Sequence, residues 1–318
     1  MTSFAACGLA VGHATDADGA TGCTVVRGVE KPFRCGAYVV GRATGTRELA
    51  LLDPSHLVDR VDAIFLSGGS AYGLDAAAGV MRWMEEHGRG FPVGDGVVPI
   101  VPGAVIFDLA PLGRFDARPT PDMAYEACEN ASTTVISGSI GAGTGAMIGK
   151  IAGPASAMKG GVGVGAADAG ALRVGALAVV NALGDVRDAA GQIIAGARAF
   201  DGSWLDTELW IARGGHDRAA PRFETLAGRS TTLCVVSTNA DLTRVQLGAM
   251  ARAASAALYR RITPVGTEFD GDVVFTTGPI DGGVTATSAQ VETLAVLALE
   301  RAIEQAVRTR APGEIVKE

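Results

Sequence analysis

The chain has 318 residues, of which 48% are apolar and 19% charged, with a formal net charge of −7 and a pI near 5.2. This length and composition allow a sizeable buried core and exclude a disordered chain of low hydrophobicity and high charge. The negative charge, without a long basic run, argues against a nucleic-acid or anionic-membrane partner.

The sequence predicts neither a membrane-spanning helix nor a secretory signal. The longest apolar stretches, such as Val174–Leu183, fall short of the roughly 20 residues that a membrane span needs. The N-terminus opens MTSFAACGLAVGHATDADG, with no basic segment before its apolar patch, so we predict a cytoplasmic location. The five cysteines contain no C-x-x-C pair, and we interpret them as reduced core residues.

In the first half of the chain, Val61–Ser67 is typical of a buried strand. After Gly68-Gly69-Ser70 the pattern predicts a helix over Tyr72–His87, which Gly88 would end. The stretch Phe91–Leu109, rich in Pro, Gly and Val, predicts short strands and turns, and Pro121–Asn130 a short helix.

The middle of the chain is dominated by glycine between Gly138 and Gly170. Arg173–Val186 follows as a long apolar strand, or two, with one amide, Asn181, inside it. Ser203–Ile211 also resembles a strand. The polar, turn-rich segment Arg213–Ser230 has little periodicity and is the best candidate for a linker.

The last third begins with a β-branched, apolar strand, Thr231–Thr238, and continues with a helix from about Leu242 to Ile262. A strand, Val273–Thr276, precedes a final helix that starts at Thr287 with capping-box spacing. Strands and helices come in clusters instead of alternating strictly, which favours a layered α+β sandwich.

Several common motifs fail on inspection. In GAGTGAMIGKI, the first glycine of a phosphate loop would fall on Thr144, and Ile151 replaces its Ser or Thr. Gly161–Gly165 gives GxGxG without the third spacing of a dinucleotide fingerprint, and Ser137 breaks a G-x-S-x-G elbow. The four histidines show no metal-ligand spacing, so we expect neither a metal nor an organic cofactor.

A hydrolase without a histidine base still needs a group that titrates near neutral pH, and an α-amino group does so at about 7.7. An N-terminal threonine can use its own amine to activate its hydroxyl. Thr231 could become such a residue by attacking the preceding carbonyl, since it stands between a polar loop and a strand. Many strands begin with threonine after a loop, so this placement alone is weak support.

Seven segments then match one family, in the family's order and over nearly the whole chain. They are Val11–Val26, Phe65–Leu74, Gly138–Lys150, Met158–Gly165, Gly175–Val186, Ser230–Thr232 and Phe269–Phe275. In this combination the chain resembles the self-processing hydrolases that include L-aminopeptidase/D-esterases, β-peptidyl aminopeptidases and endo-type nylon-oligomer (6-aminohexanoate-oligomer) hydrolases.

The resemblance implies a four-layer αββα fold like that of N-terminal-nucleophile hydrolases. It implies a single hydrolase domain over residues 1–318, cut into an α chain, 1–230, and a β chain, 231–318, that assemble into homo-oligomers such as tetramers of αβ units. The implied substrates are small peptides, amino-acid amides or oligo-amides. A threonine nucleophile in a Thr-Thr pair favours the nylon-oligomer branch.

Carried over position by position, Thr231 matches the nucleophile and Asn181 the amide that stabilises the oxyanion. Asp270 and Asp272 match acids that hold the threonine amine and hydroxyl, and Lys159 a lysine that balances them. Each has a plainer alternative: a strand amide bonded to backbone for Asn181, an Asp-Gly hairpin turn for the acids, and a solvated loop lysine.

Two further residues, Ser70 and Tyr72, are candidates to line the substrate pocket. A purely structural role is an equally good interpretation of both. The cleavage site would be Ser230–Thr231, where the nylon-oligomer branch usually has Asn in place of Ser230. That difference keeps open an unprocessed, non-catalytic scaffold that binds a small molecule. Acyl transfer of the ornithine acetyltransferase type is a third hypothesis.

Overall fold

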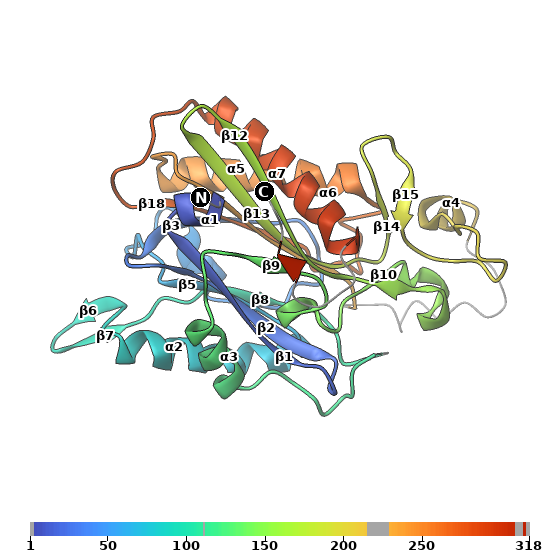
Figure 1. Ribbon diagram of the computed structural model, residues 1–318, viewed down its shortest axis with the longest axis horizontal. Coiled ribbons are helices and arrows are strands. Elements are labelled where there is room, and N and C mark those ends of the chain that lie inside the picture. Colours follow the sequence, from blue (N-terminus) through green and yellow to red (C-terminus); the bar gives the residue numbers. More distant parts are fainter. Residues whose placement is uncertain (1–2, 111, 215–228, 309–313, 316–318) are drawn as a thin grey trace.

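The computed structural model describes residues 3–110, 112–214, 229–308 and 314–315. Its main body has four layers, two β-sheets stacked face to face with helices on both outer sides (Figure 1). This confirms the αββα sandwich that the resemblance implied. The predicted linker, Arg213–Ser230, lies largely outside the described residues, as does His216.

The two main sheets have five strands each. The first runs in the order β1 (Leu9–Asp16), β2 (Thr21–Gly28), β5 (Ala63–Ser67), β8 (Gly103–Val105) and β4 (Thr46–Arg47). The second runs in the order β12 (Gly161–Ala169), β13 (Leu172–Asn181), β16 (Thr231–Thr238), β18 (Val273–Pro279) and β3 (Phe33–Val39).

The helices divide between the outer faces of the two sheets. The second sheet carries α5 (Arg244–Ala254), α6 (Ala256–Arg261) and α7 (Ser288–Arg308), and the first carries α2 (Ala77–Glu86) and α3 (Pro121–Glu129). Small elements complete the chain: α1 (Ser3–Ala6), α4 (Thr207–Ala212), β6 (Phe91–Val93), β7 (Gly96–Val98), β9 (Ile136–Ser137), β10 (Met147–Ile148), β11 (Met158–Lys159), β14 (Asp185–Arg187), β15 (Ile193–Ala195), β17 (Ile262–Thr263) and β19 (Glu314–Ile315).

The second sheet is enclosed because the helices cover one of its faces and the first sheet covers the other. A strand that is buried on both faces needs apolar or β-branched residues at every position. β16 has the sequence TTLCVVST, and all eight of its residues are buried. Polar side chains at its start are therefore held in a dry environment.

The GxGxG segment that resembled part of a nucleotide fingerprint packs against a helix. A Cβ added to Gly163 would lie 2.1 Å from the Ala302 carbonyl oxygen, and one added to Gly165 would lie 2.3 Å from that of Ala298. These glycines let β12 approach the backbone of α7 closely. The glycine pattern is thus explained by strand–helix contact.

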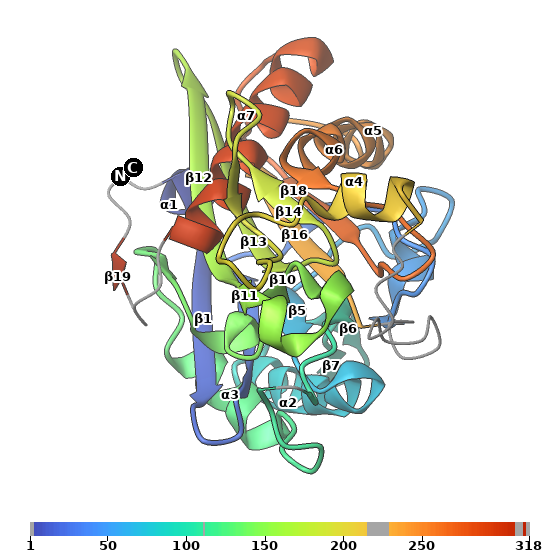
Figure 2. The same ribbon diagram turned by 90° about the vertical axis from the view of Figure 1, so that its right-hand side faces the viewer.

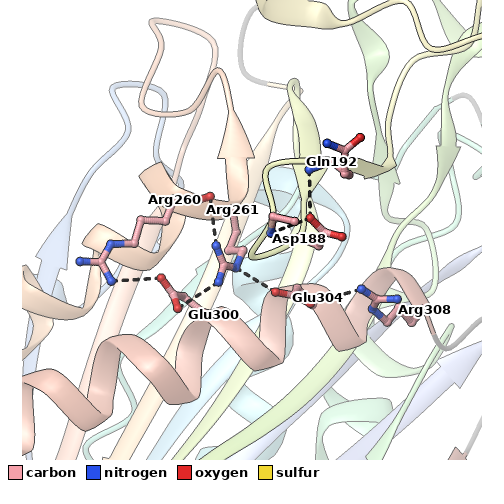
Figure 3. Close-up of polar contacts among 8 residues, drawn as sticks. Asp188, Gln192, Arg260, Arg261, Glu300, Glu304 and Arg308 are labelled. Atoms are coloured by element: carbon pink, nitrogen blue, oxygen red, sulfur yellow. Dashed lines mark hydrogen bonds and ion pairs between the residues drawn. The ribbon is translucent and has the colours of Figure 1, made fainter.

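Helices α6 and α7 are joined by a cluster of ion pairs, which we call the helix ion-pair network (Figure 3). Arg261 contacts Glu300 at 3.1 Å and Glu304 at 2.9 Å, while Arg260 contacts Glu300 at 3.2 Å and Arg308 contacts Glu304 at 3.3 Å. The side chains of Arg261 and Glu300 are only 11% and 9% exposed. Direct pairing is what makes a nearly buried charge of this kind tolerable.

Several sequence predictions are confirmed. The helix predicted over Pro121–Asn130 is α3, and the strand predicted over Thr231–Thr238 is β16 with the same bounds. The capping box at the start of α7 forms, with reciprocal bonds between Thr287 and Gln290. Cys23, Cys35, Cys128 and Cys234 are free thiols and buried, as predicted.

One prediction is wrong, and two predicted helices are divided. Ser203–Ile211 contains the helix α4 and no strand, because the Asp206 side chain caps it by accepting from the Leu209 N–H at 3.3 Å. The helix predicted over 72–87 starts as a 3₁₀ segment, Ser70–Ala76, before α2. The helix predicted over 242–262 divides into α5 and α6 at Ser255. The segment 173–186, predicted as one strand or two, forms two, β13 and β14.

Candidate active site

The ends of three neighbouring strands bring the candidate residues together. β13 and β16 are antiparallel, so the last residue of β13, Asn181, lies opposite the first residue of β16, Thr231. β16 and β18 are parallel, so the residues that precede β18 lie at the same edge as Thr231. An isolated bridge pairs Ser230 with Asp270. Residues far apart in sequence therefore converge because of strand order and direction.

The peptide bond between Ser230 and Thr231 is buried and its carbonyl is doubly hydrogen-bonded. The Thr231 hydroxyl donates to the Ser230 carbonyl oxygen at 2.6 Å, and the Gly271 N–H donates to the same oxygen at 2.8 Å. A Cβ on Gly271 would lie 2.6 Å from the Ala43 carbonyl oxygen and 2.8 Å from Thr231 Oγ1. Only glycine fits there, and its N–H is aimed where negative charge would develop on attack at this carbonyl.

The Asp270-Gly271-Asp272 turn is fixed to the segment after β3 by backbone bonds. The Val40 N–H donates to the Asp272 carbonyl at 2.9 Å, and the Ala43 N–H donates to the Asp270 carbonyl at 2.8 Å. Both aspartates are buried, with 2% and 1% of their surface exposed. Their carboxylates point into the protein, unlike those of a solvated hairpin turn.

The two carboxylates have different partners. Asp270 Oδ2 accepts from the Thr267 N–H at 2.9 Å and hydroxyl at 2.7 Å, whereas Asp272 Oδ1 accepts from the Thr232 N–H at 2.5 Å. Asp272 Oδ2 is buried and has no hydrogen-bond partner among the described residues. Burial raises the pKa of both carboxyl groups, and the neighbouring Asp270 raises that of Asp272 further.

The Asn181 side-chain amide is fully engaged. Its Oδ1 accepts from the Met147 N–H at 3.0 Å and from Lys150 Nζ at 2.9 Å. Its Nδ2 donates to the carbonyl of Phe107 at 3.2 Å and to that of Arg229 at 3.3 Å. The donor that sequence reasoning assigned to an oxyanion thus points at the backbone just before the Ser230–Thr231 bond.

The structure adds Lys150, which the sequence placed in a failed phosphate loop and at the end of a family-matching segment but did not single out as a site residue. Its Nζ donates to the Asn181 backbone carbonyl at 2.9 Å and also to the Arg229 carbonyl. Burial lowers the pKa of Lys150 to about 7, although Asp270 and Asp272 oppose this. A lone lysine in the otherwise apolar run MIGKIAG was the signal that could have identified it. We call Lys150, Asp270 and Asp272 the active-site charge cluster.

Lys159 lies on β11, opposite Met147 of β10, and these short strands lie beside the end of β13 (Figure 2). Its Nζ donates to the carbonyls of Gly143, Thr144 and Ala146 at 3.1, 2.5 and 3.2 Å. Burial lowers the pKa of Lys159 to about 8, and the charge that opposes this is Asp108. The lysine that faces the two acids of the site is therefore Lys150, whereas Lys159 is a half-buried strand residue bonded to three backbone carbonyls.

Ser70 and Tyr72 lie in the 3₁₀ segment that follows Gly69. Ser70 has a left-handed backbone, with φ of 52°, and its N–H donates to the Ile106 carbonyl at 2.9 Å. Tyr72 is 54% exposed, and the Arg118 guanidinium lies 3.6 Å from its ring centroid. The structure thus places Tyr72 at the surface, and no bond to the strand-end residues is described for either side chain.

Three other possible features of the described residues are a metal site, a membrane-spanning helix and a histidine that could act as a base. Within them, no group of three or more His, Cys, Asp or Glu residues is arranged to hold a metal ion. No helix in the described part of the chain combines the length and apolar character that crossing a bilayer requires. His13 is half-buried and shares a hydrogen bond with Thr24 Oγ1 at 2.9 Å, and desolvation lowers its pKa to about 4.

Comparison with known proteins gives one consistent result. The sequence model of peptidase family S58 matches residues 6–311. An uncharacterised aminopeptidase of Mycobacterium bovis is 42% identical over 281 residues, covering 84% of this chain and 78% of its own. A 6-aminohexanoate-oligomer endohydrolase of Kocuria sp. is 31% identical over 291 residues, covering 89% and 77%.

Two solved structures share the fold at low sequence identity. The L-aminopeptidase D-Ala-esterase/amidase of Ochrobactrum anthropi, described as a variant of the Ntn-hydrolase fold, superimposes with a TM-score of 0.68 at 19% identity, covering 94% of this chain and 83% of its own. A β-aminopeptidase of Burkholderia sp. gives 0.64 at 18% identity, covering 94% and 84%.

Proposed function

The chain belongs to peptidase family S58 and is a hydrolase acting on amide bonds, and from this premise we propose that it cuts itself between Ser230 and Thr231. The products are an α chain, 1–230, and a β chain, 231–318. The β chain then uses Thr231 as an N-terminal nucleophile. The observation that carries the proposal is the Ser230 carbonyl, bonded by the Thr231 hydroxyl on one side and the Gly271 N–H on the other.

In self-cleavage, Thr231 Oγ bonds to the Ser230 carbonyl carbon and the carbon–nitrogen bond to Thr231 breaks. The hydroxyl proton passes to the leaving nitrogen, which becomes the new α-amine, and the Gly271 N–H stabilises the oxyanion between these events. Water then hydrolyses the ester, leaving a Ser230 carboxylate and a free Thr231 hydroxyl. Lys150 can hold or release a proton during these transfers, because its pKa lies at about 7.

In turnover, the Thr231 amine serves as the base for its own hydroxyl. We assign Asp272 Oδ2, the buried carboxylate oxygen without a described partner, to hold that amine. Asn181 Nδ2, which bonds the Arg229 carbonyl in the uncut chain, becomes available to a substrate oxyanion when that carbonyl leaves. Lys150 keeps the Asn181 amide oriented through Oδ1. Removing an oxyanion donor of this type costs about 3–4 kcal/mol of barrier.

The substrates that fit are small peptides, amino-acid amides or oligo-amides. Support comes from the names of the relatives, an aminopeptidase and an oligomer endohydrolase, together with a site built for attack on an amide carbonyl. Ser70 and Tyr72 are proposed for the pocket wall on sequence grounds alone. Assembly of the cut chains into homo-oligomers is part of the proposal and can be measured by light scattering.

The test is the intact mass of the purified protein under denaturing conditions, with turnover of an amino-acid anilide and an aliphatic oligo-amide. We expect a fragment of roughly 9 kDa that begins at Thr231, together with its larger partner. Thr231→Ala should remain one chain of 32.2 kDa without turnover, whereas Thr231→Ser should retain both reactions in part. Uncut wild-type protein that binds but never hydrolyses these amides would favour the scaffold hypothesis instead.

A further inference from the structure

The Asn181 amide is held from two sides by two loops that are distant in sequence. On one side the carbonyl of Phe107 accepts from Nδ2 at 3.2 Å. On the other side the Met147 N–H donates to Oδ1 at 3.0 Å. A side-chain amide has an oxygen acceptor on one side and an NH₂ donor on the other, so these two bonds determine that the donor points towards the cleavage site. Residues that hold these two loops in place therefore also hold the Asn181 Nδ2 donor in its orientation.

The first loop is anchored by the residue after Phe107. Asp108 is 1% exposed, and its carboxylate accepts from the Gly69 N–H at 2.6 Å and from the Thr21 hydroxyl at 2.7 Å. A Cβ on Gly68 would lie 2.0 Å from Asp108 Oδ2, so this loop has no room to move closer. A buried carboxylate with two short bonds is a rigid anchor.

The second loop packs on the same aspartate. A Cβ on Gly145 would lie 2.4 Å from that of Asp108, so the backbone before Met147 rests on this side chain. The Lys159 ammonium holds three carbonyls of that loop, and its charge and that of Asp108 stabilise each other. Both loops thus rest against two charges that attract each other, the buried Asp108 carboxylate and the half-buried Lys159 ammonium.

We propose that Asp108 is a positioning residue for Asn181: together with Lys159 it fixes the loops that carry the Phe107 carbonyl and the Met147 N–H, and thereby aims Nδ2 at the substrate oxyanion. The proposal rests on the proposed function. Self-cleavage uses a different donor, the Gly271 N–H, which belongs to neither loop. Loss of Asp108 should therefore impair turnover more than self-cleavage, a split that general destabilisation would not produce.

The experiment compares Asp108→Asn with Asp62→Asn. Asp62 is also 1% exposed and bonds a backbone N–H, that of Ile100 at 2.8 Å, but contacts neither loop through a described bond. We expect Asp108→Asn to lower kcat about 10- to 100-fold, with KM and the self-cleavage rate changed less than about threefold. Asp62→Asn should change kcat less than about twofold. Equal kcat values for the two variants would overturn the proposal, as would a parallel loss of turnover and self-cleavage.

An activity-independent readout separates failure of this proposal from failure of the proposed function. The side-chain ¹⁵N–¹H signals of Asn181 should shift in Asp108→Asn and stay in place in Asp62→Asn, even in a protein without turnover. Unchanged signals would contradict positioning.

If Asp108→Asn does not fold, Thr21→Val removes one of the two hydrogen bonds to the Asp108 carboxylate and Thr21→Ser keeps it. Thr21→Val should shift the signals and lower kcat, and Thr21→Ser should restore both.

Discussion

Two groups of partly buried charges in this protein are built in opposite ways. In the helix ion-pair network, Arg261 forms close ion pairs with the carboxylates of Glu300 and Glu304. In the active-site charge cluster, Lys150 donates to carbonyl and amide oxygens of Asn181 and Arg229, and neither aspartate is its bonded partner among the described residues. The first arrangement pairs opposite charges directly, whereas the second bonds the lysine to neutral oxygens and leaves its attraction to the two carboxylates indirect.

This difference in pairing explains why the active-site charge cluster, unlike the helix ion-pair network, is suited to proton transfer. Desolvation without direct pairing displaces pKa values, and burial brings that of Lys150 to about 7 while raising those of Asp270 and Asp272. Groups that change charge near neutral pH can move protons in a reaction. A directly paired network stabilises the packing of two helices and has no such freedom. Substitutions in the active-site charge cluster should therefore change activity, whereas substitutions in the helix ion-pair network should change stability.

The largest effect is expected from Gly271→Ala, beside the active-site charge cluster. The new Cβ would lie 2.8 Å from Thr231 Oγ1, so either the hydroxyl or the N–H donor must move. Self-cleavage, followed by intact mass over time, should slow more than about 10³-fold. The control is Gly248→Ala in α5, where a Cβ meets nothing within 4 Å. Normal cleavage of Gly271→Ala would remove Gly271 from the mechanism.

Lys150→Met should lower turnover by about 10³-fold, because it removes the proton carrier and the bond that orients Asn181 Oδ1. Kinetics with an amide substrate measure this. Lys31→Met is the matched control, since Lys31 and its partner Asp281 are both 70% exposed. Turnover that is equal in the two variants would show that the active-site charge cluster does not need its lysine.

Arg261→Met should act on stability alone. It leaves Glu300 nearly buried without its closest partner, which should lower the free energy of unfolding by about 3 kcal/mol, measured with urea. Arg308→Met, at a 53% exposed position, should cost less than about 1 kcal/mol. The folded Arg261→Met protein should keep its kcat. A loss of kcat there would contradict the division between the two regions.

The last prediction concerns the pH dependence of stability. The folded pKa of Lys150 lies below the ordinary value of 10.5, so between about pH 7 and 10 the unfolded chain binds a proton that the folded chain does not. The uncut Thr231→Ala protein should therefore gain stability with rising pH relative to Thr231→Ala/Lys150→Met, by up to about 1.4 kcal/mol per pH unit. Urea unfolding at three pH values measures this slope. A slope of zero or of opposite sign would place the lysine pKa elsewhere.

Local pattern predicted most elements of the fold, because caps and periodicity act over a few residues. Thr287 and Gln290 mark the start of α7, and the β-branched run of β16 marks a strand covered on both faces. The same reasoning failed at Ser203–Ile211, where apolar residues resembled a strand but a single cap at Asp206 begins a helix. A short apolar run is compatible with either structure until its neighbours are known.

The sequence by itself determined the family and its αββα fold from motifs in order, and it predicted Thr231, Asn181, Asp270 and Asp272 as candidate groups. Only the tertiary structure decided which lysine faces the acids. Lys150 and Lys159 stand nine positions apart in similar glycine-rich surroundings, and no periodicity distinguishes them. Their roles follow from which loop each reaches across the end of β13, and contacts of that kind depend on strand order and packing, which the chain acquires only when folded.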